Sequence, residues 1–351
     1  MLPRPAVLAA LCCVGPPVHV PAAAAQDAPS APSAPAALFQ DEAPLRLTLK
    51  TDLRALFRDR DAEREDHPAT LTYVTPAGDT TSVPVALRTR GIFRLQRCAF
   101  PPLRLDLPRR RLDGTPFAGE DKLKLVTHCR DQRSFEQNLL QEYALYRVFN
   151  AVTHRGFRAR LARVTYVDSV RADTITRYAV LLESAQALAR RLGTEIVDAP
   201  NVYEFLIDDA HMTEVAVFQY LIGNTDWSVW GPHNITIVRD TVGRLYAIPY
   251  DFDFAGVIAA PYAVPAPQLP IRSVRERLYR GFCQPDSLLA TVLARFRAVK
   301  DSIYAAYRAV PDLQPGDLRR ALGYFDEFYR TIDDPGAVRR EFVRGCRRVP
   351  T

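Results

Sequence analysis

Four carboxylate or amide side chains follow short apolar segments in the second half of the chain. Asp226 and Asn234 lie in the stretch GNTDWSVWGPHN, and Asp251 and Asp253 lie in the later stretch IPYDFDFAG. Phosphoryl transfer needs a carboxylate near the attacking group and hard oxygen ligands that hold Mg²⁺ on the phosphates. The order of these residues therefore predicts Asp226 as a catalytic carboxylate, and Asn234, Asp251 and Asp253 as metal ligands.

Phosphoryl transfer also needs cations that neutralise phosphate charge, and two pairs of basic residues lie upstream. Lys122 and Lys124 alternate with leucines, so both lysines share one face of a predicted strand, and the sequence does not choose between them. Arg88 and Arg90 share a strand face for the same reason and have the geometry to clamp a phosphate. All four are candidate ligands for the phosphates of a nucleotide.

A long helix is expected after the two lysines. Ser134, with Gln137 three residues later, has the capping-box pattern that begins a helix. This helix carries Glu136 and Glu142, and either carboxylate could pair with a phosphate-binding lysine. We take Glu142 as the candidate at the cofactor site.

The elements that must position these residues change from strands to helices along the chain. Alternating apolar residues predict strands at 45–49, 69–74, 81–91, 103–107 and 121–129, and a second hairpin within 162–184. Residues 184–351 read as helices interrupted by one hairpin that contains the metal-ligand candidates. The sequence thus predicts a β-rich part at 45–183, a helical part at 184–351 and a cleft between them.

Five blocks in this order resemble a known family. They are RTRG at 88–91, DKLKLVTHC at 121–129, YAVLLE at 178–183, GNTDWS…GPHN at 223–234 and IPYDFDFAG at 248–256. Together they resemble the spore-coat CotH-type kinases, a divergent branch of the protein-kinase-like superfamily, and a group of exported bacterial proteins. The resemblance implies an α+β, bilobed protein-kinase-like fold with a β-rich N-lobe and a mainly helical C-lobe. It also implies Asp226 as the catalytic-loop aspartate, Asn234 as a metal ligand and Asp251 as the magnesium aspartate.

The chain departs from ordinary kinases in the same blocks. Seven residues separate Asp226 from Asn234, where the usual catalytic loop has four, and DFD stands in place of DFG. A glycine-rich GxGxxG loop is not recognisable, and only Gly91 of RTRG is a candidate to approach phosphates. The Asp226–Asn234 loop is therefore expected to differ most from an ordinary kinase.

The N-terminus predicts export. Residues 1–25 combine an early arginine, an apolar run and small residues, which is typical of a cleaved secretory signal, and residues 26–44 read as a Pro/Ala-rich linker. No transmembrane segment is expected after cleavage, so we predict a periplasmic or extracellular protein. The net charge is +6 with dispersed Lys and Arg, and nucleic acid is not an expected partner.

Four cysteines remain after the predicted cleavage: Cys98, Cys129, Cys283 and Cys346. An oxidising compartment favours one or two disulfides, and four cysteines allow three pairings, between which the sequence does not choose.

The predicted function is an exported phosphotransferase that uses Mg²⁺ or Mn²⁺ with ATP or another nucleotide and acts on a protein or envelope acceptor. The alternative is a catalytically inactive pseudokinase that serves as a cell-envelope binding module. A metal-dependent hydrolase is a third, weaker alternative. The simplest alternative for the aspartates is turn chemistry, since Asp and Asn commonly cap turns and strand ends.

Overall fold

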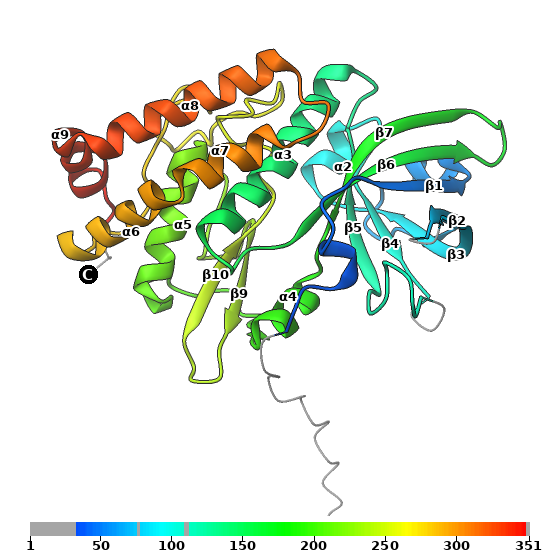
Figure 1. The fold of residues 1–351 in the computed structure, drawn as a ribbon, viewed down its shortest axis with the longest axis horizontal. Coiled ribbons are helices and arrows are strands. Elements are labelled where there is room, and N and C mark those ends of the chain that lie inside the picture. Colours follow the sequence, from blue (N-terminus) through cyan, green and yellow to red (C-terminus); the bar gives the residue numbers. More distant parts are fainter. Residues whose placement is uncertain (1–32, 76–77, 109–111, 349–351) are drawn as a thin grey trace, which may run out of the picture.

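The structure is a computed structural model that describes residues 33–75, 78–108 and 112–348 (Figure 1). The predicted signal segment lies outside these residues. Figure 1 shows the strands of the first half on one side of the molecule and the helices of the second half on the other, with α3 running between them.

Within the described residues, seven strands of the first half form a closed barrel in the order β1-β2-β3-β4-β5-β7-β6. The strands are β1 (Leu45–Thr51), β2 (His67–Val74), β3 (Thr80–Thr89), β4 (Leu103–Asp106), β5 (Lys122–Val126), β6 (Ala159–Asp168) and β7 (Thr174–Leu182). Two short helices, α1 (Leu53–Arg58) and α2 (Phe93–Arg97), lie in the connections. The predicted strands and both predicted hairpins of this half are present.

The predicted bilobed protein-kinase-like fold is wrong. The β-rich half is not an open sheet that forms an N-lobe, because its two edges meet. Strand β1 pairs antiparallel with β2 on one side and parallel with β6 on the other, from Leu45 opposite Ala162 to Thr51 opposite Asp168. Alternating apolar residues predict that a segment is a strand and which face is buried, but they contain no information on which edges pair.

The barrel has a filled interior. Along β1, Leu45, Leu47 and Leu49 point inward and are buried, while the residues between them are more exposed. Side chains from the other strands meet them in one cluster. Its members include Leu71, Tyr73, Leu87, Leu105, Leu125, Val164 and Tyr166.

The second half of strand β7 is buried on both faces. Ala179 and Leu181 belong to the barrel interior, whereas Tyr178, Val180 and Leu182 belong to a second core that contains α3 (Arg133–Val152). Because α3 packs on the barrel and also on the helices of the second half, it joins the two cores. It is the element through which the two halves of the molecule share one interior.

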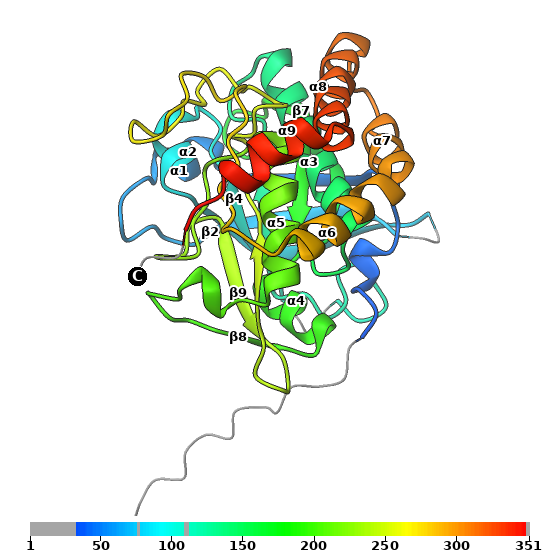
Figure 2. The same ribbon diagram turned by 90° about the vertical axis from the view of Figure 1, so that its left-hand side faces the viewer.

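The second half is mainly helical, as its sequence predicts. Figure 2 shows α6 to α9 in front of α3 and α5. Its helices are α4 (Ala185–Leu192), α5 (Asp209–Ile222), α6 (Asp286–Ala298), α7 (Lys300–Arg308), α8 (Pro315–Asp333) and α9 (Pro335–Val338). The short β8 (Glu195–Ile196) adds to the predicted hairpin of β9 (Ile235–Arg239) and β10 (Leu245–Pro249) in the order β10-β9-β8.

The start of α3 differs from the predicted capping box. The helix begins at Arg133, its N-cap residue is Gln132, and Gln132 makes no capping hydrogen bond through its side chain. Gln137 instead turns away from the helix start: its Nε2 donates to the Asp312 carbonyl at 3.0 Å, and its Oε1 accepts from the Gln314 N–H at 2.7 Å. Gln137 therefore contacts the loop before α8, and it does not cap its own helix.

Two disulfides lie within the described residues and select one of the three possible pairings. Cys98 is bonded to Cys129, and Cys283 to Cys346. The expectation of one or two disulfides is therefore confirmed. The first bond ties the end of α2 to the segment that leads into α3. In the described part of the chain, no helix combines the length and the apolar character needed to cross a membrane.

Candidate functional site

The β9–β10 hairpin places Asn234 and Asp251 at one end. The last residue pair of the hairpin is Ile235 with Pro249, and beyond it the Tyr250 N–H donates to the Asn234 carbonyl at 3.0 Å. Asn234 and Asp251 both have a left-handed backbone, with φ of 55° and 61°, which residues other than glycine rarely adopt. Backbone of this kind is more frequent at functional sites. Two such residues at one end of the hairpin make this end a candidate functional site.

Asp226 reaches the same hairpin end from the loop after α5. Asn234 Nδ2 donates to Asp226 Oδ2 at 3.0 Å, and His233 Nε2 lies 3.0 Å from Asp226 Oδ1. The hydrogen bond to Asp226 raises the pKa of His233 against the effect of partial burial, and the charge of Asp251 raises it further. Asp226, Asn234 and Asp251 therefore meet at one place.

Two glycines bring the sequence blocks of this site together. Helix α5 ends at Gly223, which has φ of 67°, and a Cβ there would lie 2.0 Å from the Tyr324 hydroxyl. The Gly223 carbonyl accepts a hydrogen bond from the Gly256 N–H at 3.0 Å, and a Cβ on Gly256 would lie 2.2 Å from the Val274 carbonyl oxygen. Larger residues at these positions would clash with Tyr324 and with the Val274 carbonyl, against which the two blocks pack.

A half-buried arginine holds the loop on both sides of Asp226. Arg280 Nη1 donates to the Thr225 carbonyl at 2.5 Å and to the Trp227 carbonyl at 2.7 Å. Its guanidinium also stacks over the Trp227 ring at 5.2 Å. Arg280 is thus a positioning residue for the Asp226 loop.

Directly beneath Asp251, the Arg94 guanidinium contacts three carboxylates. Arg94 comes from α2, and its Nη1 and Nη2 lie 3.1 and 3.3 Å from the two oxygens of Glu142 on α3. Its Nε lies 3.3 Å from Asp253 Oδ2, and its Nη2 also donates to Asp251 Oδ1. Arg94 therefore ties the barrel side, α3 and the end of β10 into one charge cluster.

The pKa values of Glu142, Asp253 and Asp251 are shifted in different directions. Burial raises the pKa of Glu142 and of Asp253. Burial also opposes the ionisation of Asp251, but Arg94 and Arg90 lower its pKa below the usual value. Asp251, whose side chain is 30% exposed, is thus the ionised carboxylate that faces the open side of the cluster.

Lys124 and Arg90 lie near Asp251, since the charge of each lowers the pKa of Asp251. Lys124 Nζ lies 4.5 Å from the centre of the Tyr250 ring. Burial and the nearby Arg90 charge lower the pKa of Lys124 to about 8, against the opposing effect of Asp251. Burial also lowers the pKa of Arg90, again against Asp251. Lys124 and Arg90 thus bring two positive charges against the one negative charge of Asp251. An added anion would reduce the repulsion between the two cations.

The other two basic candidates lie elsewhere. Lys122 is exposed at the start of β5, opposite Asp106 of β4. Arg88 Nε donates to Asp66 Oδ1 at 2.7 Å on the barrel surface. The structure thus distinguishes Lys124 from Lys122 and Arg90 from Arg88. Glu142, the predicted partner of a lysine, binds Arg94 instead.

The oxygen-bearing side chains of this site fit Mg²⁺ only in part. Among the described residues, no group of three or more His, Cys, Asp or Glu side chains is arranged to hold a metal ion. Magnesium commonly binds one or two carboxylates and takes its other ligands from substrate phosphates and water. Asp226, Asn234 and Asp251 fit that pattern. Asp251 also contacts Arg94 but keeps a partly exposed side chain, whereas Asp253 is buried, and its Oδ2 contacts Arg94 and accepts from the Tyr262 hydroxyl at 3.0 Å.

Three residues of this site were not predicted from the sequence. Arg94 and Arg280 carry no motif, although Arg94 follows Arg88 and Arg90 in the same segment. His233 also carries no motif of its own, yet it contacts Asp226. Its place directly before Asn234 was the available signal.

Comparison with known proteins does not assign the chain to a family. No protein-family model matches the chain, and no curated protein is significantly similar to it.

Proposed function

We propose that this protein is an exported phosphotransferase that binds a nucleoside triphosphate such as ATP together with Mg²⁺ or Mn²⁺. One observation carries the proposal: Asp226, Asn234 and Asp251 meet at the strained end of one hairpin, and Asp251 lies beside Lys124 and Arg90. Carboxylate and amide oxygens next to phosphate-binding cations are the groups that phosphoryl transfer requires.

Each side chain has a role in this proposal. Lys124 and Arg90 bind phosphate oxygens, for which guanidinium and ammonium groups are well suited. Asp226, held by Asn234 and next to His233, accepts the proton of the attacking hydroxyl group. Arg280 and Arg94 position the Asp226 loop and Asp251. The metal, held by Asp226, Asn234 or Asp251, would supply charge neutralisation on the phosphates.

Export is part of the proposal. It rests on the signal-like pattern of residues 1–25 and on the Cys98–Cys129 and Cys283–Cys346 disulfides, because such bonds persist in oxidising compartments. The acceptor that fits this location is a protein or another envelope component.

The second candidate function is a binding module without catalysis. It is favoured by one observation, the contact of Arg94 with Asp251, Asp253 and Glu142 at once. A guanidinium that neutralises these acids competes with a metal ion for the same oxygens. In this alternative the site binds an anionic partner through Lys124 and Arg90 and transfers nothing.

Calorimetric titration of the full chain with ATP tests the proposal, with Mg²⁺, Mn²⁺ or a chelator present. We expect cation-dependent binding that Lys124→Gln and Arg90→Gln each weaken about tenfold or more, since a hydrogen bond to a charged group is worth ~1.5–3 kcal/mol. Lys122→Gln and Arg88→Gln are the matched controls, because each removes the same charge two residues earlier in the chain, away from the cluster. Absence of nucleotide binding with either cation would contradict the proposal.

Turnover separates the two candidates. If the protein is a phosphotransferase, Asp226→Asn keeps nucleotide binding and loses phosphate release or transfer measured with radiolabelled γ-phosphate. If the unmodified protein binds nucleotide but shows no transfer and no release, the binding module is the better description.

A further inference from the structure

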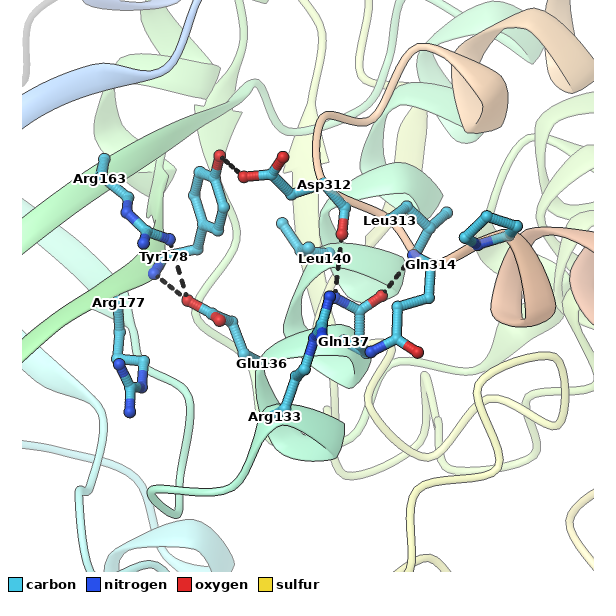
Figure 3. A pocket seen from close by; sticks show the side chains of 11 residues that line it. Arg133, Glu136, Gln137, Leu140, Arg163, Arg177, Tyr178, Asp312, Leu313 and Gln314 are labelled. Atoms are coloured by element: carbon cyan, nitrogen blue, oxygen red, sulfur yellow. Dashed lines mark hydrogen bonds and ion pairs between the residues drawn. The ribbon is translucent and has the colours of Figure 1, made fainter.

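A second candidate site lies where the barrel meets the loop before α8. A cavity of about 640 Å³ opens there between β6 and β7, the first turns of α3, and residues 312–315. Figure 3 shows Arg163 and Tyr178 of the barrel facing Asp312 and Gln314, with Glu136 and Gln137 of α3 between them. None of the predicted site residues lines this cavity.

Three arginines from three elements line the cavity: Arg133 from α3, Arg163 from β6 and Arg177 from β7. Among the described residues, two of the three have an acidic partner, and Arg133 has none. Arg177 pairs with Asp131, which is not a lining residue. Within the described part of the chain, the Arg133 guanidinium has no hydrogen bond or ion pair.

The two acids that line the cavity already have partners. Glu136 Oε1 accepts from the Tyr178 N–H at 2.7 Å and contacts Arg163 Nη1 at 3.3 Å. Asp312 Oδ2 accepts from the Tyr178 hydroxyl at 2.7 Å. Arg163 is thus paired with Glu136 and Arg177 with Asp131, which leaves Arg133 as the lining arginine without an acidic partner among the described residues.

The wall is held in place by further contacts. Gln137 fixes the loop through its hydrogen bonds to the Asp312 carbonyl and the Gln314 N–H. Asp312 has a left-handed backbone with φ of 55°, which is strained for a residue with a side chain. The Arg163 guanidinium stacks over the Tyr178 ring at 4.6 Å. The cavity is therefore preformed, which lowers the entropic cost of binding a ligand.

We propose that this cavity binds a small organic phosphate. Guanidinium groups bind phosphate oxygens with paired hydrogen bonds. Arginines that approach from three elements suit a tetrahedral group with several acceptor oxygens better than a planar carboxylate. The cavity is also within the size range of small-molecule sites, about 300–1,000 Å³, so it has room for an organic part beside Leu140 and Tyr178.

This site is separate from the Asp226 site, although α3 contributes to both. Glu136 lies at the cavity and Glu142 lies at Arg94, six positions further along the helix, which corresponds to a rise of about 9 Å. The proposal for the cavity does not rest on nucleotide binding at the first site.

Calorimetry of the full chain with ribose 5-phosphate tests the proposal, with ribose and succinate as comparison ligands. We expect ribose 5-phosphate to bind and both comparison ligands to bind at least tenfold more weakly. Arg133→Gln and Arg177→Gln should each weaken ribose 5-phosphate binding about tenfold or more. Arg171→Gln is the matched control, because Arg171 is exposed on the turn between β6 and β7 and does not line the cavity. Unchanged melting temperatures show that the variants are folded.

Lys124→Gln distinguishes this cavity from the first site. Binding that survives Lys124→Gln and falls in Arg133→Gln supports the proposal. Binding that is lost in Lys124→Gln and kept in both cavity variants would overturn it, as would equal affinity for succinate or no ribose 5-phosphate binding at millimolar concentration.

Discussion

Asn234 holds Asp226 through a single amide group, although the two residues are eight positions apart. Asn234 Nδ2 donates to the main-chain oxygen of Asp226 at 2.9 Å and to its Oδ2 at 3.0 Å. This double contact closes the loop that contains Trp227, a buried ring, and Trp230, an exposed one. The longer spacing between Asp226 and Asn234 thus still brings the two side chains together, and it does so with a strained backbone at Asn234.

The first prediction concerns that strain. Asn234→Ala should lower the free energy of unfolding by about 1–3 kcal/mol, because two hydrogen bonds are lost at roughly 1 kcal/mol each while the left-handed backbone remains. Asn234→Gly loses the same hydrogen bonds but relieves the strain, so it should be about 1 kcal/mol more stable than Asn234→Ala. Urea unfolding of both variants measures the difference. If alanine is as well tolerated as glycine, the backbone strain at this position is not real.

The second prediction concerns His233. Because Asp226 raises the pKa of His233 in the folded protein, this contribution to stability is fully present below the unfolded pKa of about 6.5. It is lost as the pH rises through the higher folded pKa. A proton NMR titration should show the His233 ring titrating above pH 6.5, and Asp226→Asn should move the midpoint down. An unchanged midpoint in Asp226→Asn would show that the contact has no electrostatic effect.

Local patterns in the sequence predict most elements of the fold but not its closure. The alternating leucines of residues 45–49 and 103–107 predict strands because a strand exposes every second residue to one face. The parallel pairing of β1 with β6 joins residues more than a hundred positions apart, such as Leu45 and Ala162. Pairing at that distance depends on the packing of the whole barrel, so the sequence led to the wrong fold class.

In the candidate site, too, the sequence predicts residues that lie in local patterns but not those that are defined by contacts between distant parts of the chain. The order of Asp226, Asn234 and Asp251 identifies them, because Asp226 follows an apolar helix, Asn234 directly precedes a strand and Asp251 follows the next strand. The sequence could not separate Lys124 from Lys122, since both occupy one strand face and only the tertiary structure puts Lys124 beside Tyr250. Arg94 was missed because its partners come from α3 and from the end of β10, far away in the chain.

The third prediction concerns Lys124. Its pKa of about 8 means that roughly half of this side chain is neutral at pH 8, where an ordinary lysine is almost fully charged. Modification of Lys124 by acetic anhydride, followed by peptide mass spectrometry, should have its midpoint near pH 8, well below that of a short lysine peptide. Asp251→Asn should move the midpoint further down, because the Asp251 charge favours the ammonium form.

The lowered pKa of Lys124 also makes the stability of the protein depend on pH. Between about pH 8 and the unfolded lysine pKa of about 10.4, the unfolded chain binds the proton more than the folded chain does. The contribution of Lys124 to stability therefore rises with pH in this window. If Lys124 and the peptide share one midpoint, Lys124 is neither buried nor close to Arg90, and the cation pair proposed for phosphate binding loses its basis.

The fourth prediction compares the two disulfides. Each closes a long loop, with sequence separations of 31 and 63, so removing either should cost about 4 kcal/mol of unfolding free energy on the chain-entropy estimate. Their local effects should differ. Cys98 ends α2, where its N–H donates to the Arg94 carbonyl at 2.9 Å, whereas Cys283 and Cys346 lie in the second half of the chain, away from Arg94.

Replacing Cys98 and Cys129 by serine should therefore release α2, and with it the Arg94 guanidinium that contacts Glu142 and Asp251. Hydrogen exchange followed by mass spectrometry should show faster exchange across residues 93–98 in this double variant at a pH and temperature where the protein stays folded. The matched double replacement of Cys283 and Cys346 should leave exchange there unchanged. Equal acceleration in both variants would mean that α2 opens only by global unfolding, and that the Cys98–Cys129 bond does not position Arg94.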